Sequence, residues 1–285
     1  MNIGIVGLGL IGGSLARTIL KKTLDNVYAF DISERALKDG KLLGAYNNLL
    51  TKDKVKELDV LFLSVYPSAV IQELENYCPL LKDGALVVDL CGVKRNITDK
   101  MKEMKRKFPN LNFIGAHPMA GREFSGVNHS TASLFERASM IICPIDSNLK
   151  VLSFFKEYCL KLGFSKVVVS TPKNHDKIIA FTSQLAHVIS SAYIKSDTAK
   201  EHLGFTAGSF RDMTRVARLS SNMWAELMSE NSDFLVKEID TLIENLIEYK
   251  LALESKNNKR LKEMLEDGNQ KKLAYEKLKR MENDE

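Results

Sequence analysis

A glycine-rich segment near the N-terminus constrains the fold of this chain more than any other feature. Its pattern is G-x-G-x-x-G, formed by Gly7, Leu8, Gly9, Leu10, Ile11 and Gly12. An apolar run, Ile3 to Val6, comes directly before it, and apolar residues at helical spacing follow it. In such a strand–turn–helix the glycines permit a tight turn, let the backbone approach a pyrophosphate, and let helix and strand pack closely. The segment therefore predicts a dinucleotide-binding unit with phosphates at the helix N-terminus.

An acidic residue at the end of the next expected strand supports this interpretation. Asp31 follows the run Val27 to Phe30, at the distance where the fingerprint places a carboxylate on the adenosine ribose. A carboxylate there repels a 2′-phosphate, which favours NAD over NADP as the cofactor. Asp31 could instead cap a helix that begins near Ser33, and Arg35 keeps NADP open. Val65, at the end of a further expected strand, is a predicted cofactor contact.

Short β-rich runs alternate with helical segments over the first part of the chain. This alternation is typical of a parallel sheet covered by helices. Several of the runs are apolar at consecutive positions, as expected for strands that are buried on both faces. The expected strands are Ile3 to Val6, Val27 to Phe30, Val60 to Val65, Leu86 to Leu90, Phe113 to Ala116, Met140 to Cys143 and Val167 to Val169.

The β pattern stops after Pro172, and the remaining sequence has the pattern of helices. We therefore expect an α/β fold, with a Rossmann-type, mostly parallel sheet over residues 1–170 and an all-helical substrate-binding and dimerisation domain over residues 171–285. An apolar stripe at spacings of three and four predicts one long helix, and consists of Leu235, Ile239, Leu242, Leu246 and Tyr249. The stripe could be covered within the helical domain or by a second subunit. The Lys- and Glu-rich end is expected to be a solvated, frayed helix.

The composition argues against several classes of protein. Of the 285 residues, 45% are hydrophobic and 27% charged, as in ordinary globular proteins. The formal charge of +5 is spread along the chain, which argues against a nucleic-acid partner. No apolar run is long enough to span a membrane, and no signal peptide precedes the first strand, so we expect a cytoplasmic protein. Four widely spaced cysteines without a C-x-x-C pair indicate buried thiols: Cys78, Cys91, Cys143 and Cys159.

Three segments that follow expected strands should meet at one edge of the sheet, where ligands of such folds bind. They contain Val65, Asp89 and His117. His117 is followed by Pro118, which would present its imidazole on a stiff loop. A dehydrogenase needs a group that accepts the hydroxyl proton as hydride leaves the carbinol carbon, and histidine suits this task. From position alone, His117 could equally be a residue that only hydrogen-bonds the loop backbone.

Further motifs occur in order along both expected domains. They are Asp89 to Lys94, His117 to Gly121 with Glu123 and Gly126, His175-Asp176, Ser183 to His187, Phe210 to Arg215, Trp224 and Asn231. With the glycine segment, they make the chain resemble the prephenate and arogenate dehydrogenase family over nearly its whole length. The H-P-M-A-G and F-R-D-M-T-R segments together are specific for this resemblance. We expect Trp224 to be a core residue and not a ligand contact.

The resemblance implies roles for residues on both domains. His117 corresponds to the catalytic histidine that hydrogen-bonds the substrate's ring hydroxyl and helps to remove its proton, and His187 to a histidine that lines the substrate pocket. Arg215 matches an arginine that holds a substrate carboxylate, a task that suits a planar guanidinium. Arg211 would share a helix face with it and is a second candidate. Without the resemblance, His187 would be interpreted as a core histidine and the arginines as solvated or ion-paired.

One position departs from the family pattern. Gly92 stands where the D-x-x-S-x-K loop of the family carries a serine that can reach the catalytic histidine or the substrate. The missing hydrogen bond must come from water, a backbone group or another side chain, or be absent. Gly92 is therefore a predicted substrate-binding position of altered chemistry.

By resemblance, the expected reaction is the NAD-dependent oxidative decarboxylation of prephenate to 4-hydroxyphenylpyruvate in tyrosine biosynthesis. Arogenate, with an amino group where prephenate has a keto group, is the nearest alternative substrate. Another Rossmann dehydrogenase with a helical second domain, such as a 3-hydroxyacid dehydrogenase, is a further alternative, as is a non-catalytic NAD(H)-sensing protein. By analogy with other enzymes that combine a Rossmann half and a helical half, we expect a homodimer formed through the helical domain. The resemblance also implies tyrosine as a feedback inhibitor. The cysteine spacing, the short apolar runs and the dispersed charge predict no metal, membrane or nucleic-acid partner.

Overall fold

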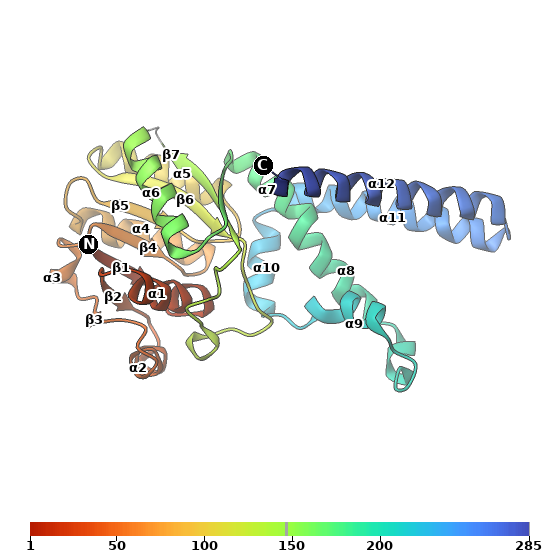
Figure 1. The fold of residues 1–285 in the computed structure, drawn as a ribbon, viewed down its shortest axis with the longest axis horizontal. Coiled ribbons are helices and arrows are strands. Elements are labelled where there is room, and N and C mark those ends of the chain that lie inside the picture. The colour runs from red at the N-terminus through yellow and green to blue at the C-terminus, as the bar shows by residue number, and fades with distance from the viewer. Residues whose placement is uncertain (146–147, 285) are drawn as a thin grey trace. The chain divides into compact units, whose positions relative to one another are not determined.

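The computed structural model of this chain describes residues 1–145 and 148–284, and its N-terminal part is built on one eight-stranded sheet (Figure 1). The strand order is β3-β2-β1-β4-β5-β6-β7-β8. The strands are β1 (Asn2–Val6), β2 (Asn26–Phe30), β3 (Asn48–Leu49), β4 (Val60–Leu63), β5 (Leu86–Asp89), β6 (Asn112–Pro118), β7 (Ser139–Ile145) and β8 (Lys166–Val169). The order reverses between β1 and β4, and in such sheets the point of reversal is where a ligand crevice forms.

The helices divide into those that cover the sheet and those that follow it. The first group comprises α1 (Leu10–Lys22), α2 (Glu34–Leu42), α3 (Lys52–Val55), α4 (Pro67–Tyr77), α5 (Arg95–Lys107) and α6 (Leu149–Leu162). The second comprises α7 (Pro172–Ile179), α8 (Ala186–Tyr193), α9 (Gly208–Thr214), α10 (Ser221–Ser229), α11 (Ser232–Glu254) and α12 (Asn258–Asp284). The expected α/β fold with a helical C-terminal part is confirmed.

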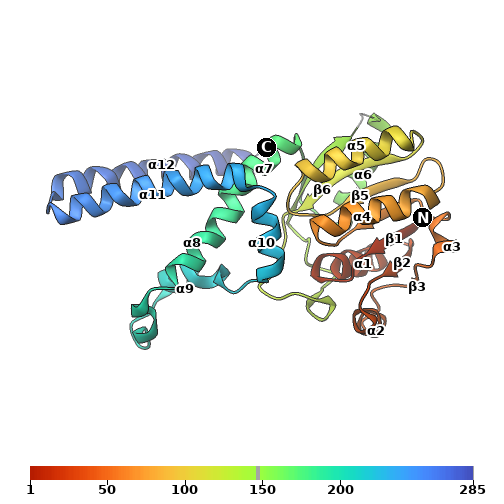
Figure 2. The ribbon, with the colours of Figure 1, turned by 180° about the vertical axis from the view of Figure 1, so that it is seen from behind.

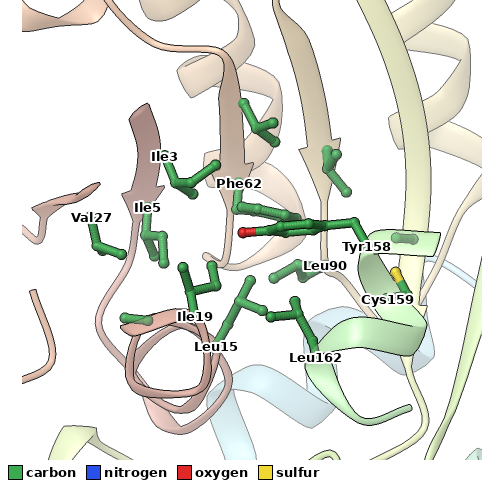
Figure 3. Packing of buried hydrophobic residues seen from close by; sticks show 14 of the residues in the cluster. Ile3, Ile5, Leu15, Ile19, Val27, Phe62, Leu90, Tyr158, Cys159 and Leu162 are labelled. Atoms are coloured by element: carbon green, nitrogen blue, oxygen red, sulfur yellow. The ribbon is translucent and has the colours of Figure 1, made fainter. Parts of the chain in front are cut away.

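The sheet is covered on both faces. One hydrophobic cluster joins the sheet to α1 and α6, and a second joins it to α3, α4 and α5. Figure 2 shows α4 and α5 in front of the strands, on the face opposite to that seen in Figure 1. Figure 3 shows the first cluster, in which Ile19 of α1 and Leu162 of α6 pack with Ile5 and Phe62 of the strands. Burial on both faces explains why the central strands are apolar at consecutive positions.

All of the expected strands form, and two features of the sheet go beyond the expectation. The short edge strand β3 was not predicted, because two exposed residues carry no periodic signal. Strand β7 runs antiparallel to β6, whereas the other neighbouring strands are parallel. A parallel connection needs a crossover, usually a helix, but residues 119–138 contain only the single helical turn Val127–His129.

The chain forms two compact units, residues 1–235 and the residues from 236 onward. The change from strands to helices falls earlier, between β8 and α7. The bounds 1–170 and 171–285 therefore stay a prediction. The second unit consists of most of α11 and all of α12, joined by a turn in which Lys256 has a φ of 51°. The predicted long helix is confirmed as α11, and Leu246 in its apolar stripe is 57% exposed.

The four cysteine thiols are buried and unpaired, as expected. Burial raises the pKa of Cys78 and of Cys159 to about 12 each. These thiols are therefore protonated at neutral pH and behave as small apolar side chains. Within residues 1–145 and 148–284, we find no helix whose length and apolar character would let it cross a bilayer.

Candidate active site

The glycine turn has the geometry that the sequence predicted. Gly7 has a φ of +93°, and a Cβ atom on it would collide with the Ser64 carbonyl. A Cβ atom on Gly12 would likewise collide with the carbonyl oxygen of Gly7. A Cβ atom on Gly9, in contrast, would have no neighbour within 4 Å. The fold itself therefore requires Gly7 and Gly12, whereas Gly9 leaves open space beside the backbone, where a pyrophosphate would fit.

The N-terminus of α1 is free to receive an anion. Gly9 is its N-cap, no side chain hydrogen-bonds to the cap, and no acidic residue occupies the first turn. The partly buried Leu10 and Ile11 belong to this turn. Leu8 has its side chain in the core, so only its backbone is available to a ligand. Val65 lies just after β4, and its Cγ1 is 2.8 Å from the position of an ideal Cβ on Gly7.

Asp31 ties the turn to the second strand. Its two carboxylate oxygens accept hydrogen bonds from the backbone N–H groups of Leu8 at 2.7 Å and Ser33 at 2.8 Å. The N-cap of α2 is Ser33, whose hydroxyl accepts a hydrogen bond from the Ala36 N–H at 3.2 Å. Ser33, and not Asp31, is therefore the N-cap residue of α2, the alternative role considered for Asp31. Asp31 stands beside the glycine turn, where a ribose of a bound dinucleotide would lie.

His117 lies at the end of β6 and contacts a second histidine. Its Nδ1 is 2.9 Å from Nε2 of His175, and the two rings meet edge to face with centroids 5.1 Å apart. His175 is buried on α7, and its Nδ1 lies 2.7 Å from Oδ1 of Asp176. A row of three polar side chains thus runs from the sheet edge into the helical part.

Asp176 connects this row to the start of α5. It accepts hydrogen bonds from the backbone N–H groups of Lys94 at 2.8 Å and Arg95 at 3.0 Å, and from Arg95 Nε at 3.1 Å. Burial acts to raise the pKa of Asp176, but the hydrogen bonds from His175 and from these backbone groups outweigh it, and the pKa lies below its ordinary value. Asp176 is therefore ionised at neutral pH.

A buried ion pair lies next to the two histidines. Lys94 and Asp89 are completely buried and form a salt bridge, and Asp89 Oδ1 also accepts a hydrogen bond from the Cys91 N–H at 2.9 Å. Burial lowers the pKa of His117 well below its ordinary value, and His175 and the Lys94 ammonium lower it further. His117 is therefore neutral at pH 7, which is the state in which an imidazole can accept a proton.

Gly92 lies beside the imidazole of His117. An ideal Cβ on Gly92 would lie 3.9 Å from His117 Cε1 and 3.4 Å from Cδ2 of Leu227, which belongs to α10. The position therefore faces the imidazole of His117. The side chain that contacts Nδ1 of His117 is His175, at 2.9 Å, and what replaces the serine hydroxyl of the family at Gly92 stays open.

A cavity of about 350 Å³ opens in the helical part. Its lining residues are Thr182, Ser183, Ala186, His187, Ile189, Asp212, Met213, Arg215 and Val216. His187 and Arg215 thus share one cavity, as expected for residues that bind one ligand, and His117 is not part of its lining. A volume of this size is in the range of small-molecule sites.

His187 is held in place by two contacts. Its Nδ1 is 2.9 Å from the Ser183 carbonyl oxygen, which can only accept a hydrogen bond, so Nδ1 carries the proton and Nε2 is left as an acceptor. Its ring stacks on Trp224 of α10, with centroids 3.7 Å apart. Trp224 is partly buried and is not part of the cavity lining, so its expected place in the core stays a prediction. Burial, and then Arg215, lower the pKa of His187.

The two candidate arginines differ in their surroundings. Arg215 lines the cavity, and its Nη1 forms an ion pair with Glu123 Oε1 at 2.6 Å, on the segment that follows His117. Arg211 is exposed on α9 and does not line the cavity. Helix α9 ends at Thr214, and Arg215 begins a separate 3-10 turn. The expectation that the two arginines share one face of a continuous α-helix is therefore wrong.

The sequence did not assign roles to His175 and Asp176, although their dipeptide was noted as a motif. Adjacent His and Asp residues at the start of a helix carry no signal for the side chains that they will meet. The contact with His117 spans 58 positions of sequence, and it forms only because α7 packs against the end of the sheet. Asn231 also makes a contact between distant positions that no local pattern predicts: its side-chain amide donates a hydrogen bond to the Asp176 carbonyl at 2.8 Å.

Comparison with known families covers both parts of the chain. Residues 15–169 match the family model for the prephenate dehydrogenase nucleotide-binding domain, and residues 171–267 match the model for the prephenate dehydrogenase dimerization domain. The sequence is 29% identical to a cyclohexadienyl dehydrogenase from Zymomonas mobilis, over 96% of this chain and 95% of that protein. It is also 29% identical to a prephenate dehydrogenase from Lactococcus lactis, over 96% of this chain and 77% of that protein.

Solved structures give the same relationship. The prephenate dehydrogenase from A. aeolicus in complex with hydroxyphenyl propionate and NAD+ superposes with a TM-score of 0.84 at 25% identity, covering 96% of this chain and 98% of that one. The Synechocystis arogenate dehydrogenase shares the fold, with a TM-score of 0.79 at 23% identity, covering 96% of this chain and 100% of that one. The chain therefore belongs to the prephenate dehydrogenase family.

Proposed function

We propose that this dehydrogenase catalyses the NAD-dependent oxidative decarboxylation of prephenate to 4-hydroxyphenylpyruvate in tyrosine biosynthesis. The observation that carries the proposal is the neutral imidazole of His117, held at the carboxyl end of β6, two strands away from β4 and the reversal point of the sheet. A neutral imidazole there can accept the proton of the substrate's ring hydroxyl. The family membership of the chain supports this assignment over the other Rossmann dehydrogenases.

NAD is the cofactor that we propose for the glycine turn. Gly7, Gly9 and Gly12 would leave room for its pyrophosphate, Asp31 would bind the adenosine ribose, and Val65 would lie near the bound dinucleotide. The N-terminus of α1, to which no side chain hydrogen-bonds, would bind the negatively charged pyrophosphate of the cofactor. The bound cofactor would accept the hydride, while the protein orients both reactants.

The remaining binding roles fall to the helical part. We assign the substrate carboxylate to Arg215, and Nε2 of His187 would accept a hydrogen bond from the same ligand. Arg211 is a weaker candidate because it lies outside the cavity lining. Gly92 would border the substrate near His117 without contributing a hydroxyl.

Arogenate is a second candidate substrate, and one residue favours it. Asp212 lines the cavity together with Arg215, and its carboxylate could pair with the ammonium group that distinguishes arogenate from prephenate. The Zymomonas mobilis relative is named a cyclohexadienyl dehydrogenase, which agrees with a site open to more than one substrate. Oxidation of both compounds is therefore the alternative form of the proposal.

We further propose a homodimer that forms through the helical domain. The match to a dimerization-domain model supports it, as do the apolar side chains that α11 leaves exposed, which include Val236, Ile243, Leu246 and Ile247. Tyrosine, which resembles the product, would bind in the substrate cavity as a competitive inhibitor.

A substrate panel tests the function directly. The purified protein is mixed with NAD or NADP and with prephenate or arogenate, and the absorbance band of the reduced nicotinamide is followed. We expect turnover of prephenate with NAD and, in His117→Asn, retained binding with kcat lower by about 10²-fold or more. Cofactor binding without turnover of either substrate would instead favour an NAD(H)-sensing protein, and near-normal turnover by His117→Asn would remove this residue from the mechanism.

A further inference from the structure

The row of Asp176, His175 and His117 has a consequence for the chemistry of the site. We propose that His175 and Asp176 are positioning residues that fix the tautomer of His117, so that Nδ1 carries its proton and Nε2 is the bare nitrogen that accepts the substrate proton. The inference rests on the proposed role of His117 as the base. It follows from the hydrogen-bonding capacity of each group in the row, taken from the buried end outward.

Asp176 can only accept hydrogen bonds. Its carboxylate is ionised and already receives hydrogen bonds from two backbone N–H groups and from the Arg95 guanidinium. Its Oδ1 lies 2.7 Å from Nδ1 of His175. An ionised carboxylate has no proton to give, so Nδ1 of His175 is the donor in this contact.

His175 in turn can only accept at its other nitrogen. Burial and the Lys94 ammonium lower its pKa, and although Asp176 acts in the opposite direction, the pKa stays below its ordinary value. A neutral imidazole carries one proton, and that proton is on Nδ1. Nε2 of His175 is therefore an acceptor, and the donor across the distance of 2.9 Å is Nδ1 of His117. Neutral His117 then has no proton on Nε2.

This tautomer is the one that a base needs. As the substrate hydroxyl is oxidised, its O–H bond breaks and an N–H bond forms at Nε2 of His117, which becomes an imidazolium. The imidazolium still donates from Nδ1 to His175, and the negative charge of Asp176 stabilises it through that ring. The charged and titratable groups that act on His117 are His175 on α7 and Lys94 ahead of α5, and those that act on His175 also include Asp89. Asp176 offsets part of the repulsion from Lys94.

Nitrogen NMR of the histidines tests the tautomer without any substrate. The whole chain contains five histidines, so [15N]histidine labelling gives few signals, and His117→Asn and His175→Gln assign the two that matter. At neutral pH we expect His117 with a protonated Nδ1 and a bare Nε2, and His175 with a protonated Nδ1. A proton on Nε2 of neutral His117 would overturn the proposal, whichever substrate the protein uses.

Two substitutions of His175 test the consequence for catalysis. Glutamine at 175 offers an amide oxygen that can accept from Nδ1 of His117, whereas leucine of similar size offers none. We expect His175→Leu to lower kcat by about 10²-fold while KM changes less than about threefold, and His175→Gln to keep kcat within about tenfold of the wild type. Thermal unfolding of both variants confirms that they are folded.

The kinetic outcomes separate positioning from a merely structural role. Unchanged kcat in both variants would show that His117 needs no orienting partner, and equal losses in both would show that His175 acts only through packing; either result overturns the proposal. If the wild-type protein oxidises neither prephenate nor arogenate, the proposed function fails, and the NMR measurement alone decides the tautomer.

Discussion

At the scale of single residues, the buried Lys94 contributes to the charge state of the site. Its ammonium is completely buried, which is costly unless the charge is paired, and the carboxylate of Asp89 supplies the pairing. The ammonium also contributes to the lowered pKa values of His117 and His175. Burial is the main cause of the lowered pKa values, and the Lys94 ammonium adds to it, so both rings are neutral at the pH where the enzyme would work.

The lowered histidine pKa values predict a pH-dependent stability. His117, His175 and His187 bind protons less readily in the folded than in the unfolded chain. Their contribution is therefore fully present above the unfolded pKa of 6.5 and is lost as the pH falls below it. We expect the urea concentration at the unfolding midpoint to decrease when the pH is lowered from about 7.5 to about 5.5. The decrease should be smaller in His117→Asn, which lacks one of these imidazoles. A midpoint that is flat over this range would contradict the burial of neutral imidazoles.

Gly92 allows a test of the position that departs from the family pattern. A Cβ there would make ordinary contact with Leu227, and the backbone conformation does not require glycine. We expect Gly92→Ser to leave the free energy of unfolding unchanged within about 0.5 kcal/mol and to retain dehydrogenase activity.

Gly115→Ser is the matched control for this substitution. A Cβ on Gly115 would lie 2.9 Å from Thr98 Cγ2, so its unfolding free energy should fall by about 1–3 kcal/mol. Urea unfolding measures both variants. Equal destabilisation of the two would show that the space beside His117 is not open.

At the scale of elements, the helical run from α7 to α8 is interrupted by a wider π-helical turn, Ala180–Leu185. Such turns insert a residue and are frequent at functional sites. Within this turn, buried Gln184 donates a hydrogen bond to the Leu227 carbonyl at 2.8 Å and accepts one from Asn231 at 2.8 Å. The turn therefore joins the helix that carries His175 to the helix that carries His187, and fixes both to α10.

The glycine turn ahead of α1 predicts that two alanine substitutions have different effects. Gly9→Ala adds a methyl group to open space, so we expect unchanged thermal stability and an NAD dissociation constant that is about tenfold or more higher, because the methyl occupies the path of the pyrophosphate. Gly12→Ala collides with the Gly7 carbonyl and should destabilise the protein as well.

Calorimetric titration with NAD and thermal unfolding separate the two effects. If Gly9→Ala bound NAD as tightly as the wild type, the pyrophosphate could not lie at this turn. If Gly12→Ala were as stable as the wild type, the close approach of helix and strand would not be needed.

At the scale of the whole molecule, polar contacts fix the first helices of the C-terminal part onto the Rossmann part within residues 1–235. The Glu226 carboxylate of α10 accepts a hydrogen bond from the Ser68 N–H at 2.6 Å, and Arg95 pairs with Asp233 at 2.5 Å. The ion pair of Arg215 with Glu123 is a third link, and it occupies a guanidinium that the proposed function needs. Substrate and Glu123 would therefore compete for Arg215.

This competition predicts the effect of Glu123→Gln. The Arg215 side chain is 63% exposed, so loss of its ion pair with Glu123 should leave the urea midpoint unchanged. With the competing charge removed, we expect KM for prephenate to be about two- to fivefold lower. The control is Glu136→Gln, which removes a carboxylate from the ion pair with Lys22 and should leave KM unchanged. Steady-state kinetics with prephenate measure KM for both variants. A raised KM in Glu123→Gln would contradict the prediction and mean that Glu123 assists substrate binding.

The amino-acid sequence alone determined the local elements of this protein. The glycine turn, Asp31 and the apolar strands follow from patterns a few residues long, because backbone conformation and burial act between near neighbours. The resemblance added His117, His187 and Arg215 as candidate site residues. The sequence also indicated where strands give way to helices, after residue 170.

Which distant residues meet depends on the packing of the folded chain. The antiparallel course of β7, the row from His117 to Asp176, and the pairing of Arg215 with Glu123 each join segments with no local pattern in common. The same holds for Gly92, which is separated in sequence from Leu227 of α10 but faces it in space. The physical reason is that such contacts depend on how whole helices and strands pack, and no short sequence window contains both partners.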